Sequence, residues 1–276
     1  MLVKRVAAAK ACECGDVVAD PATNELLHYT ERPETYVSDL VNTGVYVFHP
    51  GQLFDAIGNC VVEKAHSASI RSSLDAHPKQ ARASMCPPEQ YVRMDGDILT
   101  PHAGKKALFV HETSGFWEQI KSPGATLKAT ELYLGWFQST QPERLLPEAS
   151  AEGMTRVVGA VYMHPSAKVD PSAKVGPNVS IGAHVCVGPG ARLMSCTLLD
   201  DAVVGDHSVV SHAIIGWKSE LGSWSRVQGT GDAGHKMGGV AILGEHVLVG
   251  DEVVVVNCIV LPHKEIKASV KEEIIL

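Results

Sequence analysis

The sequence predicts an α/β region followed by a β-solenoid, and three observations support this fold class. An aliphatic residue recurs every six positions through the second half of the chain, whereas the first half lacks this repeat. A stretch rich in Pro, Glu and Ser separates the halves at 139–153. With 276 residues, 45% of them hydrophobic, the chain can bury a core in one or two domains. We therefore expect an α/β domain over residues 1–146, a linker over 147–160 and a solenoid over 161–276.

The six-residue period defines the second half. It matches neither a helix nor a single strand, but it matches a short strand followed by a tight corner, so three units close one triangular coil. We expect the apolar anchor to point inward and the Gly or Asp that follows it to take the corner, where unusual backbone angles are needed. The step shortens to five residues before Leu198 and Ile215. The anchors are Met163, Val169, Val175, Ile181, Val187, Leu193, Leu198, Val204, Val210, Ile215, Leu221, Val227, Leu243, Val249, Val255 and Leu261.

This repeat resembles the left-handed parallel β-helix of the hexapeptide-repeat proteins over residues 163–266. The resemblance implies a fold and no single activity, since this prism serves acyltransferases, carbonic anhydrases and nucleotidyltransferases. The repeat is interrupted at 228–241, where Gly229, Gly231 and Gly234 form a G-x-G-x-x-G pattern. No strand-turn-helix context surrounds the pattern, so we expect a loop extruded from a coil corner and no dinucleotide site.

Three histidines are candidate zinc ligands. His184, His207 and His212 have nearly the spacing of hexapeptide carbonic anhydrases, but they occupy different positions within their repeats. Zinc needs converging ligands, so we favour three exposed corner residues. Cys12 and Cys14 have no second Cys or His pair, so we expect no metal site and reduced thiols among the seven cysteines.

The sequence of the first half predicts short helices and strands that alternate along the chain. In chain order we expect a helix over 6–11, a hairpin of strands 16–19 and 25–30, a core strand over 40–48, a helix over 52–57, a surface loop over 59–88, a strand over 107–111, and a helical segment over 116–137 that is broken at Pro123.

Net charge and hydropathy limit the binding partners and the cellular compartment that we expect for this protein. The formal net charge is −7, from 24 Lys and Arg against 31 Asp and Glu, and no basic cluster indicates nucleic-acid binding. No stretch reaches the roughly 18 apolar residues of a membrane span, and the apolar run at 6–9 is too short for a secretory signal. We expect a cytoplasmic protein with no membrane or nucleic-acid partner.

Several blocks of the first half resemble the sugar-binding half of the sugar-nucleotide pyrophosphorylases, above all the GDP-mannose pyrophosphorylases (mannose-1-phosphate guanylyltransferases). These blocks are Gly15–Asp20, Leu27–Glu34 and Val41–Phe48. Further blocks resemble the alpha-type subunit of that family: Phe116–Lys121, Ile215–Ser219, Trp224–Val227, Ile259–Lys264 and Ile274–Leu276. The resemblance covers nearly the whole chain and implies an incomplete, Rossmann-like nucleotidyltransferase domain before the β-helix.

The resemblance also implies a substrate-binding site for a sugar phosphate or GDP-mannose. Gly15 and Asn42 would contact the sugar, with Gly44 beside them, and Glu31 would bind sugar hydroxyls. Arg32 replaces a phosphate-binding Lys and keeps its charge. Taken without the resemblance, Glu31–Pro33 is equally typical of a solvated turn, and Asn42–Gly44 of a strand bulge.

Two departures from the family argue against catalysis. The Gly-rich phosphate loop that opens the family's domain is missing from this sequence, so we expect the chain to begin inside the catalytic domain and assign no catalytic residue. Gln119 replaces the Asp that binds Mg²⁺ in active members, and a neutral amide is a poor ligand for a hard cation. The resemblance therefore implies a regulatory subunit of GDP-mannose synthesis that binds no cofactor alone and partners a catalytic beta-type subunit or itself.

Three alternatives remain open. The sequence could be a shortened gene model of an active guanylyltransferase, a structural assembly subunit, or a hexapeptide acyltransferase, which would need coenzyme A. Because part of the nucleotidyltransferase sheet is missing, we also expect the strands around Val17 and Val45 to lack neighbours and the first half to be partly open.

Overall fold

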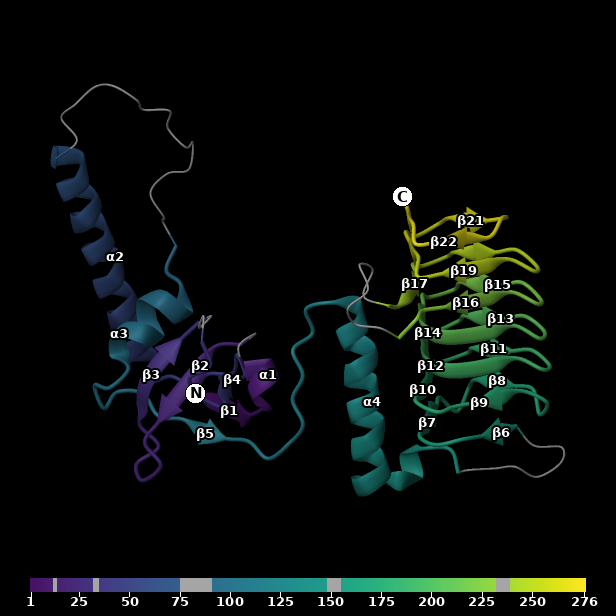
Figure 1. Cartoon of the computed structure of the whole chain (residues 1–276), viewed down its shortest axis with the longest axis horizontal. Helices are drawn as coiled ribbons and strands as arrows, with labels where there is room; N and C mark the ends of the chain where they lie inside the picture. The colour runs from purple at the N-terminus through teal and green to yellow at the C-terminus, as the bar shows by residue number, and fades with distance from the viewer. Residues whose placement is uncertain (12–13, 32–34, 75–90, 148–154, 232–238) are drawn as a thin grey trace. The chain divides into compact units, whose positions relative to one another are not determined.

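The computed structural model describes residues 1–11, 14–31, 35–74, 91–147, 155–231 and 239–276. It contains two compact units, Met1–Trp117 and Glu118–Leu276 (Figure 1). The sequence-based boundary at residue 146 therefore lies beyond the structural one. The difference arises because helix α4 (Pro123–Thr140) and the 3₁₀ turn η2 (Pro142–Arg144) belong to the second unit, where α4 contacts strands β12 and β14.

A five-stranded sheet organises the first unit, in the order β3-β2-β4-β1-β5. Its strands are β1 (Leu2–Arg5), β2 (Asp16–Ala19), β3 (Leu26–Thr30), β4 (Leu40–Asn42) and β5 (His111–Glu112). Among the described strands of this sheet, only β1 and β5 pair in parallel. Val3, Val17, Leu26 and Leu99 form its core. Val17 is fully buried on β2 between two neighbours, so the expectation of missing neighbours there was wrong, while Val45 is half exposed.

The helices of this unit differ most from the sequence prediction. They are α1 (Ala8–Ala11), α2 (Pro50–Leu74), the π-helix η1 (Met94–Leu99) and α3 (Thr100–His102). The predicted loop over 59–88 was wrong as far as residue 74, because α2 continues through Glu63, Lys64 and Ala65, which are good helix formers. Residues 75–90 lie outside the described residues. The predicted strand 40–48 ends at Asn42, since Gly44 adopts φ +80°.

The second unit is a parallel β-solenoid, as expected for a left-handed β-helix, and its strands form three faces (Figure 1). The first face contains β8 (Lys168–Val169), β11 (Cys186–Val187), β13 (Val203–Val204), β15 (Glu220–Leu221), β18 (Leu248–Val249) and β21 (Glu265–Ile266). The second contains β7 (Val161–Met163), β10 (Val179–Ile181), β17 (Ala241–Leu243), β20 (Ile259–Val260) and β23 (Ile274–Ile275). The third contains β6 (Arg156–Val157), β9 (Lys174–Val175), β16 (Arg226–Gln228), β19 (Val254–Val256) and β22 (Val270–Lys271).

Two longer strands, β12 (Arg192–Leu198) and β14 (Val209–Ile215), cross from the third face to the second. The first half of β12 pairs with β9 and its second half pairs with β10. Ser195 and His212 take positive φ at this corner, which shortens the step between anchors to five residues. Asn257 repeats this geometry, so Val260 points inward at 1% exposure while Leu261 is 40% exposed. The predicted anchor at Leu261 was therefore wrong by one residue.

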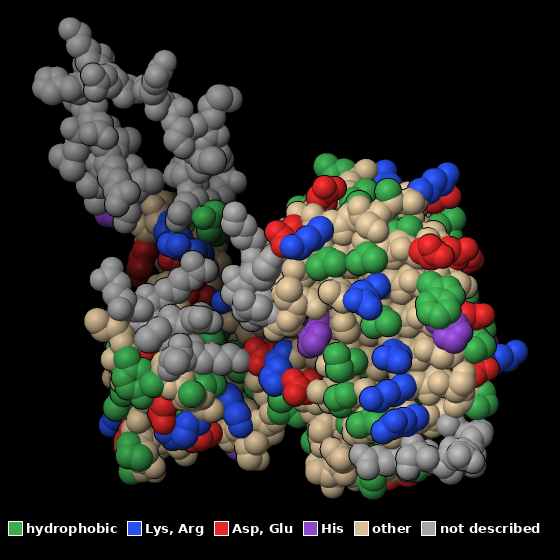
Figure 2. All heavy atoms as spheres, turned by 45° about the vertical axis from the view of Figure 1, so that its right-hand side comes forward, with side chains coloured by type: hydrophobic (Ala, Val, Ile, Leu, Met, Phe, Trp, Pro, Cys, Tyr) green, Lys and Arg blue, Asp and Glu red, His purple; other side chains and the backbone are tan. Residues whose placement is uncertain are grey.

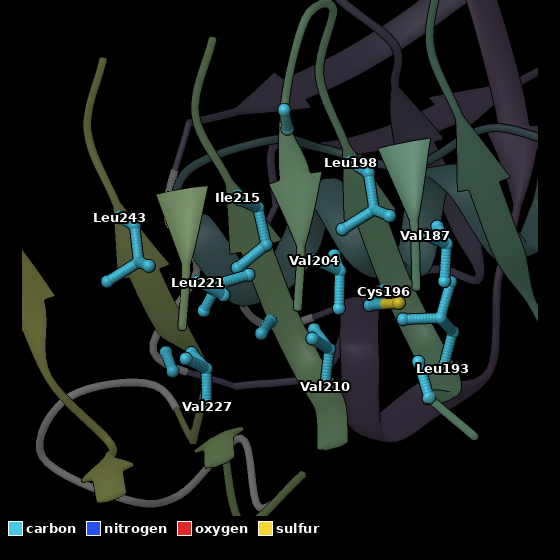
Figure 3. Close-up of a cluster of buried hydrophobic side chains, with 14 of the residues drawn as sticks. Val187, Leu193, Cys196, Leu198, Val204, Val210, Ile215, Leu221, Val227 and Leu243 are labelled. Atoms are coloured by element: carbon cyan, nitrogen blue, oxygen red, sulfur yellow. The ribbon is translucent and has the colours of Figure 1, made fainter. Parts of the chain in front are cut away.

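The other predicted anchors line the core of the prism or pack against it. Figure 3 shows Leu193, Leu198, Val210 and Ile215 directed into one interior, together with Cys196, which the six-residue pattern did not identify. Within this described cluster the side chains are almost wholly aliphatic. The stability of the solenoid therefore rests on apolar burial along its axis.

Glycines in the coils mainly allow neighbouring coils to stack closely, and this role is more common than an unusual backbone angle. A Cβ on Gly216 would lie 2.2 Å from the carbonyl oxygen of Gly244 in the next coil. The positive φ angles at the corners fall mainly on other residue types, so the predicted corner role of glycine was largely wrong. These corner residues are Asn178, His184, Ser195, Asp201, His207, His212, Lys218, Trp224, His246, Glu252, Asn257, His263 and Glu272.

The interruption leaves the prism at the corner shared by Ser195, His212 and Asn257. The Gly229 amide donates to the Ser211 carbonyl at 2.8 Å, and the Thr230 amide donates to Asn257 Oδ1 at 2.9 Å. The predicted corner position is confirmed, and residues 232–238 lie outside the described residues. Among the described helices, none is both long and apolar enough to cross a membrane.

Candidate functional site

Three of the five predicted substrate-binding residues meet at the ends of β2 and β4. The Asn42 amide donates to the Gly15 carbonyl at 2.9 Å, and the Gly44 amide donates to Asn42 Oδ1 at 2.9 Å. Glu31 is exposed just beyond the end of β3. Arg32 lies outside the described residues, so the structure brings together Gly15, Asn42 and Gly44 only.

Two tyrosines and an aspartate complete the cluster. Asn42 Nδ2 donates to the hydroxyl oxygens of Tyr29, at 3.2 Å, and Tyr46, at 2.5 Å. The Tyr29 hydroxyl in turn donates to Asp95 Oδ1 at 2.7 Å. Both amide hydrogens of Asn42 are thereby engaged, which fixes the side-chain orientation. We call these six residues, including Gly15 and Gly44, the Asn42 cluster.

Sequence reasoning missed Tyr29, Tyr46 and Asp95. Both tyrosines stand inside blocks that carry the family resemblance, so their position offered a signal that was not used. Asp95 lies in η1, far from the other members in sequence, and only the tertiary fold brings it to Tyr29. No local pattern could have identified it.

The protonation of the cluster follows from its burial. Burial raises the pKa of the Tyr29 hydroxyl, and the hydrogen bond to Asp95 raises it further. Burial likewise raises the pKa of Tyr46, whereas Asn42 opposes the rise. Both phenols therefore stay neutral around pH 7 and act as hydrogen-bonding groups.

Gly15 is required by close packing. A Cβ at this position would lie 2.7 Å from the Tyr29 hydroxyl oxygen and 3.3 Å from its ring. Any larger residue would displace the tyrosine that Asn42 and Asp95 hold. The cluster thus combines a closely approaching backbone with hydroxyl, amide and carboxylate oxygens, an arrangement suited to hydrogen-bonding a polyol.

Trp117 connects the cluster to the segment that contains Gln119. Its indole Nε1 donates to the Thr43 carbonyl at 3.2 Å, and its ring packs against Ala11 and Val41. Gln119 follows two residues later and is exposed. Its amide can contribute a neutral oxygen and no carboxylate charge, so the donor set does not fit Mg²⁺ as a carboxylate would. Within the described residues, no group of three His, Cys, Asp or Glu side chains could hold a metal.

The three candidate zinc histidines occupy three different corner columns. The His184 column continues through Asp201, whose amide donates to Ala183, while the His207 column continues through Trp224, whose amide donates to Asp206. His212 belongs to the Ser195 corner. The three imidazoles of one chain are therefore kept apart by the prism.

Comparison with known proteins gives consistent results. Residues 157–276 match the family model described as GMPPB C-terminal domain. The chain is 42% identical to the mannose-1-phosphate guanylyltransferase regulatory subunit alpha-B of Danio rerio, and 40% identical to the regulatory subunits alpha of Rattus norvegicus and Xenopus tropicalis. Each alignment covers 95% of this chain. The chain spans 64% of the Danio and Rattus proteins and 63% of the Xenopus protein.

Proposed function

We propose that the chain is an alpha-type regulatory subunit in GDP-mannose synthesis, since residues 157–276 match the model of the GMPPB C-terminal domain and 95% of the chain aligns with regulatory subunits of mannose-1-phosphate guanylyltransferase. In this role it binds a product or substrate of the pathway and does not itself transfer a nucleotide. The order of its sequence blocks and the identity of about 40% with several such subunits support the proposal.

The Asn42 cluster is the proposed sugar-binding surface, and it is the observation that carries the ligand assignment. Hexose hydroxyls both donate and accept hydrogen bonds, and the Tyr46 hydroxyl, Asn42 Oδ1 and the Asp95 carboxylate keep lone pairs that can accept from them in fixed orientations. Glu31 and Arg32 are proposed to add contacts to sugar hydroxyls and phosphate. GDP-mannose or a sugar phosphate is the ligand class that these groups would recognise together.

Gln119 supports the non-catalytic part of the proposal. Mg²⁺ would supply charge neutralisation during nucleotidyl transfer, and a neutral amide offers it a weak ligand. The residues of this chain would therefore bind and orient the sugar nucleotide while leaving the transfer to a partner. We propose a catalytic beta-type subunit as that partner, with self-association as the alternative.

Calorimetric titration with GDP-mannose, combined with a turnover assay, tests this function. The purified chain is expected to bind GDP-mannose and to form none from GTP and mannose 1-phosphate in the presence of Mg²⁺. Asn42→Ala is expected to weaken binding about tenfold, equivalent to about 1.4 kcal/mol. Formation of GDP-mannose by the chain alone would overturn the non-catalytic assignment, and the absence of any binding would overturn the proposed ligand.

A further inference from the structure

Four basic side chains line one face of the prism. Arg156, Lys174, Arg192 and Arg226 begin four of the third-face strands, β6, β9, β12 and β16, and all four are exposed. Arg156 pairs in register with Lys174, and Lys174 with Arg192, whereas Val209 intervenes before Arg226. We call these residues the basic column. Figure 2 shows Lys and Arg side chains stacked along the prism.

This arrangement is unfavourable without an anion. Neighbouring strands are about 4.8 Å apart, and like charges directly opposite each other destabilise a sheet. Among the residues that the structure describes, no carboxylate forms an ion pair with any member of the basic column. Because no described carboxylate offsets the repulsion between these positive charges, the arrangement indicates that the four side chains bind an anion.

An aromatic pair stands beside the column. The rings of His207 and Trp224 stack with centroids 4.3 Å apart, and Trp224 is 62% exposed. His207 fits this position because Gly190, one coil away, carries no side chain, and a Cβ there would lie 2.3 Å from the imidazole. A cavity of about 250 Å³ joins the two features, lined by Gly190, Arg192, His207, Val209, Trp224 and Arg226.

We propose that this cavity binds a nucleoside phosphate, with the base against Trp224 and the phosphates between Arg192 and Arg226. Guanidinium groups bind phosphate oxygens in pairs, and an exposed indole stacks on a nucleobase. The two arginines start strands two coils apart, about 10 Å, with apolar Val209 between them. The cavity suits a small ligand with one planar and one anionic part better than an acidic protein surface. The site goes beyond the proposed function, because none of its residues belongs to the Asn42 cluster.

Titration of tryptophan fluorescence tests the site directly. GDP and GTP are the probes, with guanosine and inorganic pyrophosphate as comparison ligands, all in the Asn42→Ala background so that the first site contributes about tenfold less. We expect GDP and GTP to quench the fluorescence, Trp224→Phe to abolish most of the quenching, and Arg192→Gln combined with Arg226→Gln to weaken binding at least about tenfold in calorimetry. The matched control, Lys168→Gln with Lys218→Gln, removes two exposed charges elsewhere on the prism and should leave binding unchanged.

The comparison ligands separate the outcomes. Weaker binding of guanosine and pyrophosphate than of GDP supports a two-part site. Pyrophosphate binding as tightly as GDP, or equal losses in the arginine and lysine double variants, would overturn the proposal. Retention of GDP-mannose binding by the arginine variants with an intact Asn42 would show that the two sites are separate, so failure of one proposal does not decide the other.

Thermal unfolding of the ligand-free chain tests the charge argument. Arg192→Gln relieves the repulsion with Lys174 and is expected to raise the midpoint at low salt, with a smaller rise at high salt because the ions screen the repulsion. A lower midpoint would mean that Arg192 supports the fold itself and would overturn the inference that the column is held for a ligand.

Discussion

Asn42 forms hydrogen bonds through its backbone amide, its side-chain Nδ2 and its side-chain Oδ1. The geometry of the Asn42 cluster therefore depends on this one residue. Gly15 and Tyr29 approach so closely that neither can grow without displacing the other. The orientation of the cluster is thus set before a ligand arrives, which reduces the entropy lost on binding.

Gly15→Ala tests this packing. The added methyl would meet the Tyr29 hydroxyl, and we expect a loss of about 1–3 kcal/mol in the free energy of unfolding together with weaker GDP-mannose binding. Chemical denaturation and calorimetry measure the two effects. Gly96→Ala in η1 is the control, since a Cβ there meets no atom within 4 Å. Equal effects of the two variants would contradict the account.

Cysteine reactivity offers a second test at the residue scale. Burial raises the pKa of Cys196 to about 12, whereas Cys186 is exposed. We expect a maleimide at pH 8 to modify Cys186 rapidly and Cys196 only in denaturant, as read by peptide mass spectrometry. Rapid modification of Cys196 in the native chain would mean that the core of the prism opens.

At the scale of elements, α2 is fastened to η1 by an ion pair. Lys64 Nζ lies 2.7 Å from Asp97 Oδ2, and the hydrogen bond from Lys64 lowers the pKa of Asp97. A carboxyl whose pKa falls on folding stabilises the folded state above its unfolded pKa, and this stabilisation is lost as the pH drops through the folded value.

We therefore expect the wild-type first unit to lose stability below about pH 4, the ordinary range of an Asp carboxyl. Asp97→Asn should remove about 1 kcal/mol at pH 7 and flatten the acid dependence. Denaturant titrations between pH 7 and pH 2.5 measure both. An unchanged acid dependence in the variant would contradict the assignment.

The coils of the prism depend on glycines at stacking positions. Gly216→Ala places a methyl against the Gly244 carbonyl of the next coil and is expected to lower the midpoint of thermal unfolding by several degrees. Gly250→Ala is the matched control in the same solenoid, because its nearest contact, at 3.4 Å, is ordinary. Similar midpoints for the two variants would contradict the stacking role.

The sequence predicted correctly those elements whose positions follow from one local pattern, such as the coils of the prism. The six-residue period located nearly every inward anchor, because each coil repeats the same strand and corner. It missed Val260 because Asn257 shortens the step, and it missed Cys196 because β12 continues through its corner. Strand β1 was not expected, since four residues become a strand only by pairing with β4 and β5. The predicted helix over 52–57 lies within α2, but the part of α2 from residue 59 onward was predicted as a loop because the stretch 59–88 is rich in polar residues and contains three prolines.

The candidate site was likewise predicted only in part from the sequence. The family blocks predicted Gly15, Asn42 and Gly44, and the structure places these three together. Tyr29 and Tyr46 lie inside the family blocks and were overlooked, whereas Asp95 required the fold, since its hydrogen bond to Tyr29 joins residues 66 positions apart.

At the scale of the whole molecule, the two units carry different chemistry. The first presents the hydroxyl, amide and carboxylate groups of the Asn42 cluster, and the second presents the basic column beside the stacked His207 and Trp224 rings. The chain spans 64% of the length of the Danio rerio and Rattus norvegicus proteins described above.

The most direct test of the central claim is calorimetric titration of the purified chain with GDP-mannose, with wild type, Asn42→Ala and the Arg192→Gln, Arg226→Gln double variant in parallel. The account predicts saturable binding to wild type and to the arginine variant, and affinity about tenfold lower for Asn42→Ala. Absence of binding to wild type, or equal affinity of Asn42→Ala, would contradict the assignment of the Asn42 cluster as the sugar-nucleotide site.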